Sequence, residues 1–295
     1  MDNGKVEFKL IKRVKDEKFS VDNLHDYNLL LQVGPKDFQV CVTDPIRSKC
    51  LLLEEYRLTG VKNYTDLVEV LTKIYDGHHI LMAGFWNGVK VAVKNKKFTL
   101  ISSSLFVKDH LFEYLSFNCQ INPQADKLYY YKHTKTDAIT VFAVNRKLVD
   151  WFNGLYKNIT VQVIHQGSAF IEGILNNDDH SHDKSLFIFA DGAVLHLMVG
   201  KDRKLEYYNQ FTVHSINEAL KYILLTMKAF QLDPDRGKVL LWGNIDSNSS
   251  FFKALYKFIR NVSFGNKPKY LKFNYAFDEV FDHNYFDLYS LYICD

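Results

Sequence analysis

The sequence predicts an α/β protein, because the same order of elements occurs twice along the chain. From Ser185 to Ile245, three strand-like segments precede an amphipathic helix and a strand that ends in Gly243-Asn244. A weaker version of this order runs from Tyr27 to Phe85. Period-two alternation of apolar residues marks the strands, and apolar residues spaced by three or four mark the helices. A duplicated β-β-β-α-β cassette in 295 residues predicts two domains.

Composition fits an ordinary globular protein and argues against nucleic acid as a partner. The chain is 47% hydrophobic and 24% charged, and its net charge of +3 is too small for a basic binding face. The Lys-rich start, Lys5 to Lys18, is interrupted by acidic residues and predicts a solvated edge strand.

Cysteine usage and hydropathy bear on the compartment. The four cysteines form no C-x-x-C pair; Cys41 and Cys50 could approach each other on neighbouring strands, but core thiols are the simpler reading. The N-terminus has no signal-peptide pattern, and no apolar run approaches the ~20 residues of a membrane helix. We therefore expect a cytoplasmic protein without membrane insertion.

The first cassette and its extension predict alternating strands and helices. Asn63 and Asp66 begin a helix whose apolar stripe includes Leu67 and Leu71. Further helices are expected after the serines at 102–104 and over Arg146–Tyr156 and Ser168–Leu175. The expected strands are 5–21 (one or two), Tyr27–Gln32, Phe38–Val42, Cys50–Leu58, His79–Gly84, Val89–Val93, Phe98–Ile101, Lys127–His133, Ala138–Val144 and Val161–Ile164.

A polar tract separates the two halves. The segment 176–184, NNDDHSHDK, has no apolar residue, so we predict domains over 1–177 and 185–295 joined by a linker over 178–184. In the second half, Ser215 and Glu218 form a capping box for the cassette helix. A helix over Ser249–Arg260, a strand over Tyr270–Phe273 and a final helix through Tyr285, Leu288, Tyr289 and Tyr292 follow; the final helix is expected to pack across the domain junction.

Three segments carry a resemblance to a known fold. FTLISSSLF (98–106), ITVFAVNRKLVDWF (139–152) and DHNYFDLYSLYICD (282–295), in this order, resemble a bacterial family of unknown function with an actin-like ATPase fold. The tandem cassettes also resemble the pilus-assembly and secretion-platform members of that superfamily. The resemblance implies two ribonuclease-H-like domains, each a mixed sheet flanked by helices, with a cleft between them.

The resemblance also implies where a nucleotide would bind. Active members carry an Asp in each of two D-x-G phosphate hairpins, and their adenosine loop ends in Gly-Gly. The first hairpin matches Gln32-Val33-Gly34, where an amide replaces the carboxylate. The second matches Ala190-Asp191-Gly192, where Asp191 is offset by one residue and is expected to face the opposite side. The adenosine loop matches Trp242-Gly243-Asn244. The vestigial cleft thus comprises Gln32, Gly34, Asp191, Gly192, Gly243 and Asn244.

The sequence of this cleft is compatible with two functions. Loss of both aspartates removes the ligands that magnesium requires, which favours a scaffold without catalytic activity or cofactor that binds another protein. The alternative is an enzyme resembling an ATPase or a sugar kinase, which binds ATP and magnesium through other ligands; the surviving glycines allow close backbone approach. A cleft filled by Trp242 would argue against this alternative.

Other side-chain clusters are given weaker interpretations. His180 and His182 lie in the acidic tract, which predicts a solvated linker more than a metal site. A metal or acid–base site from Asp44, Glu54, Glu55 and Asp191 is not supported by their spacing, and His165 and His196 lack a nucleophile elbow. The aromatic residues from Phe273 to Tyr292 are expected to be core, with a partner face as the alternative.

Overall fold

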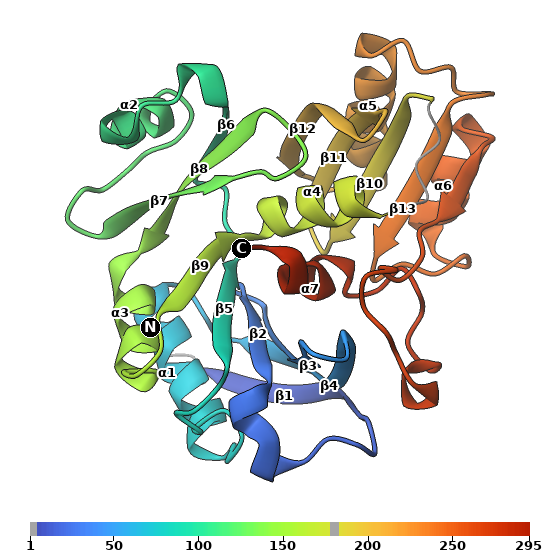
Figure 1. The fold of residues 1–295 in the computed structure, drawn as a ribbon. Coiled ribbons are helices and arrows are strands. Elements are labelled where there is room, and N and C mark those ends of the chain that lie inside the picture. Colours follow the sequence, from blue (N-terminus) through green and yellow to red (C-terminus); the bar gives the residue numbers. More distant parts are fainter. Residues whose placement is uncertain (1–4, 178–182) are drawn as a thin grey trace.

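The chain forms two large mixed sheets and a small third sheet (Figure 1). The structure is a computed structural model, and it describes residues 5–177 and 183–295. In both large sheets, three antiparallel strands are followed by a helix and a strand that runs parallel to the first of the three. The repeated cassette expected from the sequence is therefore present.

The first large sheet has the strand order β1-β4-β3-β2-β5-β9. β1 pairs antiparallel with β4, β4 with β3, and β3 with β2. β2, β5 and β9 run parallel to one another. Asn63 caps α1 by accepting hydrogen bonds from the amides of Thr65 and Asp66. The elements are β1 (Glu7–Lys15), β2 (Asn28–Val33), β3 (Asp37–Asp44), β4 (Lys49–Thr59), α1 (Tyr64–Asp76), β5 (Gly88–Val93), α3 (Arg146–Leu155) and β9 (Val161–His165), with a 3-10 turn at Val21–Asp26.

The second large sheet has the order β12-β11-β10-β13-β14. Ser215 caps α5 through the amide of Glu218, and the buried face of α5 covers the sheet through Leu220, Ile223 and Met227. The elements are β10 (Ser185–Asp191), β11 (Val194–Lys201), β12 (Lys204–Thr212), α5 (Ile216–Ala229), β13 (Lys238–Gly243), α6 (Ser250–Phe258) and β14 (Val262–Phe264).

A smaller unit is inserted between β5 and α3. Its three strands lie in the order β6-β8-β7, and α2 covers one face through Leu115. The other face packs toward the first large sheet through Phe142 and Val144. The elements are β6 (Phe98–Ser102), 3-10 turns at Ser103–Leu105 and Lys108–His110, α2 (Leu111–Ser116), β7 (Asp126–Lys132) and β8 (Ala138–Asn145).

Two helices lie between the large sheets (Figure 1). α4 (Gln166–Asn176) is almost entirely buried, and α7 (Phe286–Ser290), followed by a 3-10 turn at Leu291–Ile293, packs against α4, β2 and β3. Phe286 of α7 contacts Phe170 of α4 and Trp242 of β13. The final helix thus contacts elements of both halves. The division of the chain at 178–184 stays a prediction, and residues 178–182 lie outside the described ranges.

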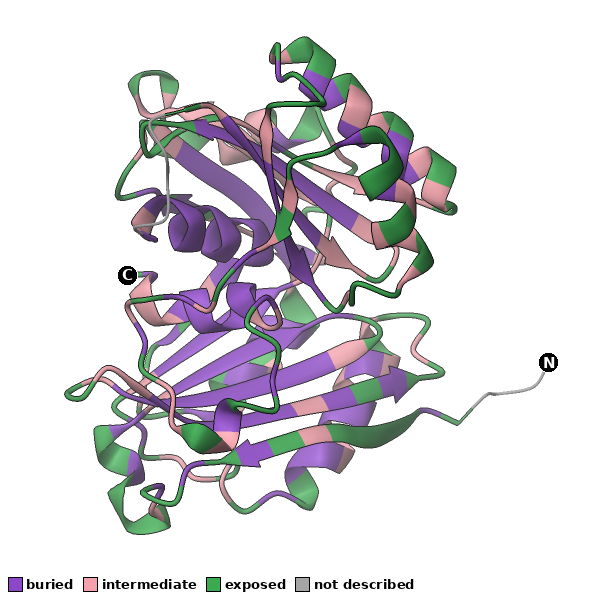
Figure 2. Cartoon of the chain, turned by 90° about the vertical axis from the view of Figure 1, so that its right-hand side faces the viewer, coloured by how far each residue is buried: buried purple, intermediate pink, exposed green. Residues whose placement is uncertain are grey.

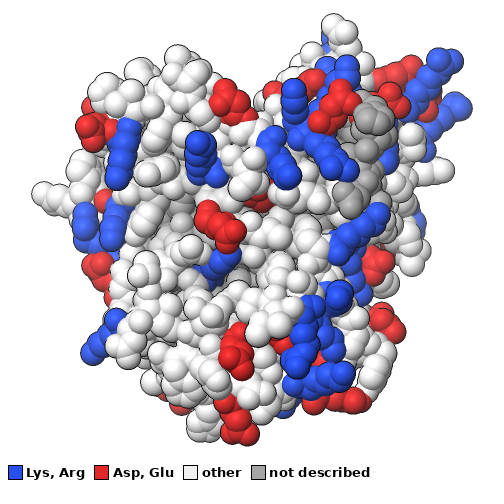
Figure 3. All heavy atoms as spheres, viewed as in Figure 1, with Lys and Arg blue, Asp and Glu red and all other residues white. Residues whose placement is uncertain are grey.

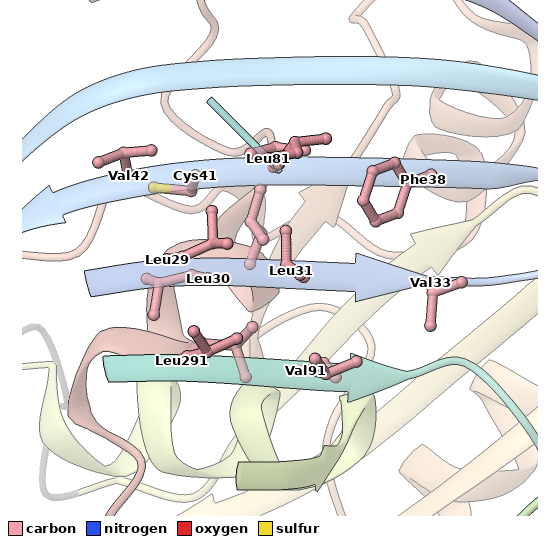
Figure 4. Packing of buried hydrophobic residues seen from close by; sticks show 14 of the residues in the cluster. Leu29, Leu30, Leu31, Val33, Phe38, Cys41, Val42, Leu81, Val91 and Leu291 are labelled. Atoms are coloured by element: carbon pink, nitrogen blue, oxygen red, sulfur yellow. The ribbon is translucent and has the colours of Figure 1, made fainter. Parts of the chain in front are cut away.

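The core around β2 explains why this strand is central. Leu29, Leu30 and Leu31 are fully buried and point to both faces of the sheet (Figure 4). Such a continuous apolar run is typical of a strand that is covered on both sides. β2 therefore fixes its neighbours β3 and β5, whose ends form one wall of the cleft described below.

Two expected strands are absent from the described structure. Residues 79–84 form a turn and an irregular segment, because β5 supplies the fourth strand of the cassette, and Leu81 is buried in the core from that turn. Tyr270–Phe273 makes only a single bridge, Lys49 to Lys272. β14 was not expected from the sequence.

Charge on the surface is mixed. Acidic side chains are interspersed among Lys and Arg on the face shown in Figure 3. Among the described residues, no helix has the length and apolar character needed to cross a membrane.

Candidate functional site

A cleft of about 600 Å³ lies where the two cassettes meet. The β2–β3 hairpin, which contains Gly34, forms one wall, and the β10–β11 hairpin, which contains Gly192, forms the other. The end of β13 adds Gly243 and Asn244. Four of the six predicted cleft residues therefore line the cavity: Gly34, Gly192, Gly243 and Asn244. Asp191 also lines it, whereas Gln32 is fully buried and does not line it.

Lys94 is the central side chain of the cleft. It follows directly on β5, and its side chain is only 9% exposed. Its Nζ donates to Oδ2 of Asp37 at 2.6 Å and lies 3.1 Å from Oδ2 of Asp191. Asp37 belongs to the first hairpin and Asp191 to the second. One ammonium therefore bridges the two walls.

A second carboxylate network is centred on Asp287 and shares Asp191 with Lys94. Asp287, at the start of α7, is buried and accepts hydrogen bonds from Nε2 of Gln32 at 2.6 Å and from Nε2 of Gln166 at 2.9 Å. Gln166 also donates to Oδ2 of Asp191 at 2.9 Å. Because an amide can serve two carboxylates at once, Gln166 at the start of α4 ties α7 to the second hairpin.

The protonation of this cluster follows from burial and from the lysine. Burial favours the neutral acids and raises the pKa of Asp37 and Asp287, against the opposing charge of Lys94. Burial acts the same way on Asp191, but Lys94 and Gln166 outweigh it and lower its pKa. Burial alone would lower the pKa of Lys94, yet its carboxylate neighbours raise it. Lys94 is therefore a permanent cation.

The carboxylate of Asp191 faces the cleft, which corrects the expectation that it points to the opposite side. The alternation of a strand applies only within the strand, and Asp191 is the last residue of β10. Gly192 follows with a φ of 58°, so the chain turns at this point. Ala190, at the position of the missing aspartate, lines the cavity as well.

Sequence reasoning missed four residues of the site: Asp37, Lys94, Gln166 and Asp287. Asp37 lies three residues after Gly34, at the start of the second strand of the first hairpin, where the D-x-G match does not extend. Asp287 lies in the closing segment that carries the family resemblance, and this was the available signal. Lys94 and Gln166 have no local motif; only the fold brings them together.

Trp242 does not fill the cleft. It is buried between Phe187 and Phe286, and its indole donates to the carbonyl of Asn266. The cavity is therefore not blocked by Trp242, which the sequence alone could not decide. Above the carboxylates, Glu55 accepts a 2.5 Å hydrogen bond from Tyr285. Several cations line the cavity as well: Lys36, Arg57, Lys62 and Lys96.

The residues present do not fit a magnesium site. Magnesium requires carboxylate or water oxygens in an octahedral shell. At the two positions that would supply carboxylates stand Gln32 and Ala190, and the carboxylates that are nearby already surround Lys94. Within residues 5–177 and 183–295, no group of three or more potential ligands is placed to hold a metal ion.

The other proposed clusters are structural or dispersed. Glu54 bonds Arg13 and His78, away from Glu55, and Asp44 pairs with Arg47. His180 and His182 lie outside the described residues. The remaining groups are core: His165 and His196 are fully buried, and Cys41 and Cys50 are buried thiols 3.5 Å apart.

Sequence comparison places the chain in a family. Residues 16–262 match the family described as protein of unknown function (DUF3822), and the chain belongs to that family. No functionally curated protein shows significant similarity to it.

Solved structures show the fold. A Bacteroides thetaiotaomicron VPI-5482 protein with an actin-like ATPase fold and unknown function superposes with a TM-score of 0.77 at 17% identity, covering 94% of this chain and 99% of that one. The PilM–PilN type IV pilus biogenesis complex contains a chain that superposes with a TM-score of 0.58 at 11% identity, covering 90% and 97%. The chain therefore has the actin-like ATPase fold that the sequence predicted.

Proposed function

We propose that this chain is a non-catalytic, protein-binding module built on the actin-like ATPase fold. The observation that carries the proposal is Lys94, whose ammonium lies between the two hairpins, bonded to Asp37 and near Asp191. An ammonium at this position neutralises the carboxylates and takes the space of a divalent cation. Without a metal, the charge that develops in phosphoryl transfer is not stabilised.

The comparison with PilM supports the second half of the proposal. That protein has the same fold and is found in a complex with a second protein, PilN. We infer a protein partner for this chain as well, and a role that depends on its surfaces.

The cleft itself favours a second candidate function. It is open, and Lys36, Lys62 and Lys96 line it. A nucleotide or another phosphate compound held by these cations without magnesium is the alternative, and it would be a ligand and not a substrate.

Thermal unfolding separates these proposals. The protein is heated alone, with ATP and EDTA, and with ATP and magnesium at millimolar concentration, and ATP hydrolysis is measured in parallel. A ligand at a hundredfold excess over Kd stabilises the folded state by about 2.7 kcal/mol, which is several degrees in Tm. We expect no change in Tm and no hydrolysis.

A cleft-blocking variant, Ala193→Trp, gives the control. A rise in Tm with ATP and EDTA that is lost in this variant would support the alternative ligand. Magnesium-dependent hydrolysis lost in the same variant would refute the non-catalytic proposal. Ala193 lines the cavity at the tip of the second hairpin and is only partly buried, so a larger side chain there is expected to extend into the cleft.

A further inference from the structure

β1 is a sheet edge with an open side. It pairs with β4 alone, and no other strand of the described chain pairs with it. Residues Glu7 to Ile11 are all exposed, and Figure 2 shows the strand that follows the N-terminus exposed along most of its length. The 3-10 turn at Tyr275–Phe277 also approaches the strand. The exposed part, Glu7 to Ile11, presents unpaired amide and carbonyl groups that can accept another strand.

The two faces of this edge differ in chemistry. Phe8 and Leu10 lie opposite Leu58 and Tyr56 and share their face of the sheet; they are 41% and 38% exposed. The neighbouring Lys9 lies on the other face, opposite Arg57. An added strand would therefore meet apolar side chains on one face and cationic ones on the other.

The other face is cationic at its outer edge and has an acidic residue further in, where Asp37 of β3 lies opposite Arg57. Lys9 and Arg57 are directly opposite each other and exposed, and like charges in this relation are destabilising. After an irregularity in the pairing, Lys12 lies opposite Glu55, which already accepts from Tyr285. Within the described residues, no ion pair involves Lys9 or Lys12. Carboxylates on an added strand would relieve this repulsion.

We propose that the outer edge of β1 binds an extended acidic segment of a partner protein, in which carboxylates alternate with apolar residues. The carboxylates would face Lys9 and Lys12, and the apolar residues would cover Phe8 and Leu10. The proposal deepens the protein-binding role given above and rests on it.

A second copy of this chain fits the edge poorly. The segment 5–18 contains six Lys or Arg residues and three acidic ones, so two β1 strands side by side would place like charges together. The acidic strand is the occupant that complements the edge.

Binding is tested with a fluorescein-labelled, capped nine-residue peptide in which Glu alternates with Val, titrated with the full chain and followed by anisotropy. The peptide with Lys in place of Glu serves as the opposite-charge control. We expect the acidic peptide to bind, and the K9E/K12E variant to bind about tenfold more weakly, a change of about 1.4 kcal/mol. The K221E/K228E variant has the same change in charge on the exposed face of α5 and is expected to bind like the parent.

Hydrogen exchange distinguishes an added strand from loose ion pairing. Amides of Glu7 to Lys12 that point away from β4 are expected to exchange more slowly when the peptide is bound. Binding without this protection, equal weakening in both charge variants, or no binding would overturn the proposal. So would a dimer of the protein alone that K9E/K12E dissociates, because the occupant would then be a second copy. The nucleotide experiment tests only the cleft, so failure of the β1 proposal and failure of the non-catalytic proposal would give different experimental results.

Discussion

Lys94 and Asp191 join the two halves of the cleft: Nζ of the first, after β5, lies 3.1 Å from Oδ2 of the second, at the end of β10. Neither residue is near the other in sequence, and each belongs to a different large sheet. This ion pair, together with the hydrogen bond from Gln166 to Asp191, connects the second hairpin to the first half of the cleft.

Replacing this ammonium should destabilise the protein. Lys94→Met keeps the length of the side chain but leaves Asp37, Asp191 and Asp287 without a cation, and we expect a loss of about 3 kcal/mol at pH 7. The loss should shrink as the pH falls, because Asp37 and Asp287, whose pKa is raised by burial, take up protons and no longer need a counter-charge. Urea unfolding at several pH values measures it.

The control for that experiment is Lys96→Met, an exposed lysine two residues away. It is expected to change the free energy of unfolding by less than about 0.5 kcal/mol. An equal loss in both variants, or a Lys94→Met loss that grows in acid, would contradict the role assigned to the ammonium.

The fold could be predicted from the sequence much further than the site. The cassettes were visible because strands such as Leu29–Leu31 and the α5 face are set by local periodicity and capping. The strand expected over residues 79–84 was wrong for the same reason. An apolar run shows that Leu81 is buried, but it does not show that the residue lies in a turn. The spacing of apolar residues identifies which side chains are buried, but it does not determine the backbone conformation that buries them.

The site depends on contacts that no local pattern records. Asp287 meets Gln32 across 255 positions, and Gln166 across 121. Matching the two phosphate hairpins and the adenosine loop residue by residue named Gly34, Gly192 and Gly243, and all three line the cavity, since the cassette sets the ends of these strands. Whether a carboxylate is present there could not be predicted in this way, because Asp37 and Asp287 reach the same space from other elements.

Two of the cleft glycines, Gly192 and Gly243, should respond differently to substitution. Gly243 has a φ of 114°, and a Cβ there would lie 2.1 Å from the carbonyl oxygen of Ala190, so Gly243→Ala should cost about 3 kcal/mol or more. At Gly192 the φ is 58° and no atom lies within 4 Å, so Gly192→Ala should cost only about 1–2 kcal/mol. Denaturant unfolding of both variants checks this order, and equal losses would show that the backbone near Gly243 relaxes.

Buried histidines should make stability fall in mild acid. Burial lowers the pKa of His165 to about 4 and that of His196 to about 3, from an unfolded value of about 6.5. Between these values the unfolded chain binds protons that the folded chain does not, so stability is full above pH ~6.5 and is lost as the pH falls toward 4. Each histidine should contribute a slope of about 1.4 kcal/mol per pH unit.

His196→Gln should remove one such contribution from the slope between pH 6.5 and 5, whatever its effect on stability at pH 7. His25→Gln removes an exposed imidazole and serves as the control. The free energy of unfolding is measured across this range in both variants. The same change of slope in both would show that the buried imidazole is not its source.

The inserted unit should be held to α4 by one carboxylate. Oε1 of Glu172 lies 2.8 Å from Nδ1 of His133, and Thr134 donates to the same carboxylate through its amide and its hydroxyl. Glu172→Gln should cost about 2 kcal/mol, since a charged acceptor is lost among buried donors. Hydrogen exchange should rise in β7 and β8 before it rises in β2. Glu206→Gln breaks a surface pair with Lys184 and should cost less than about 1 kcal/mol. Uniform exchange across the chain in the Glu172 variant would contradict a local role.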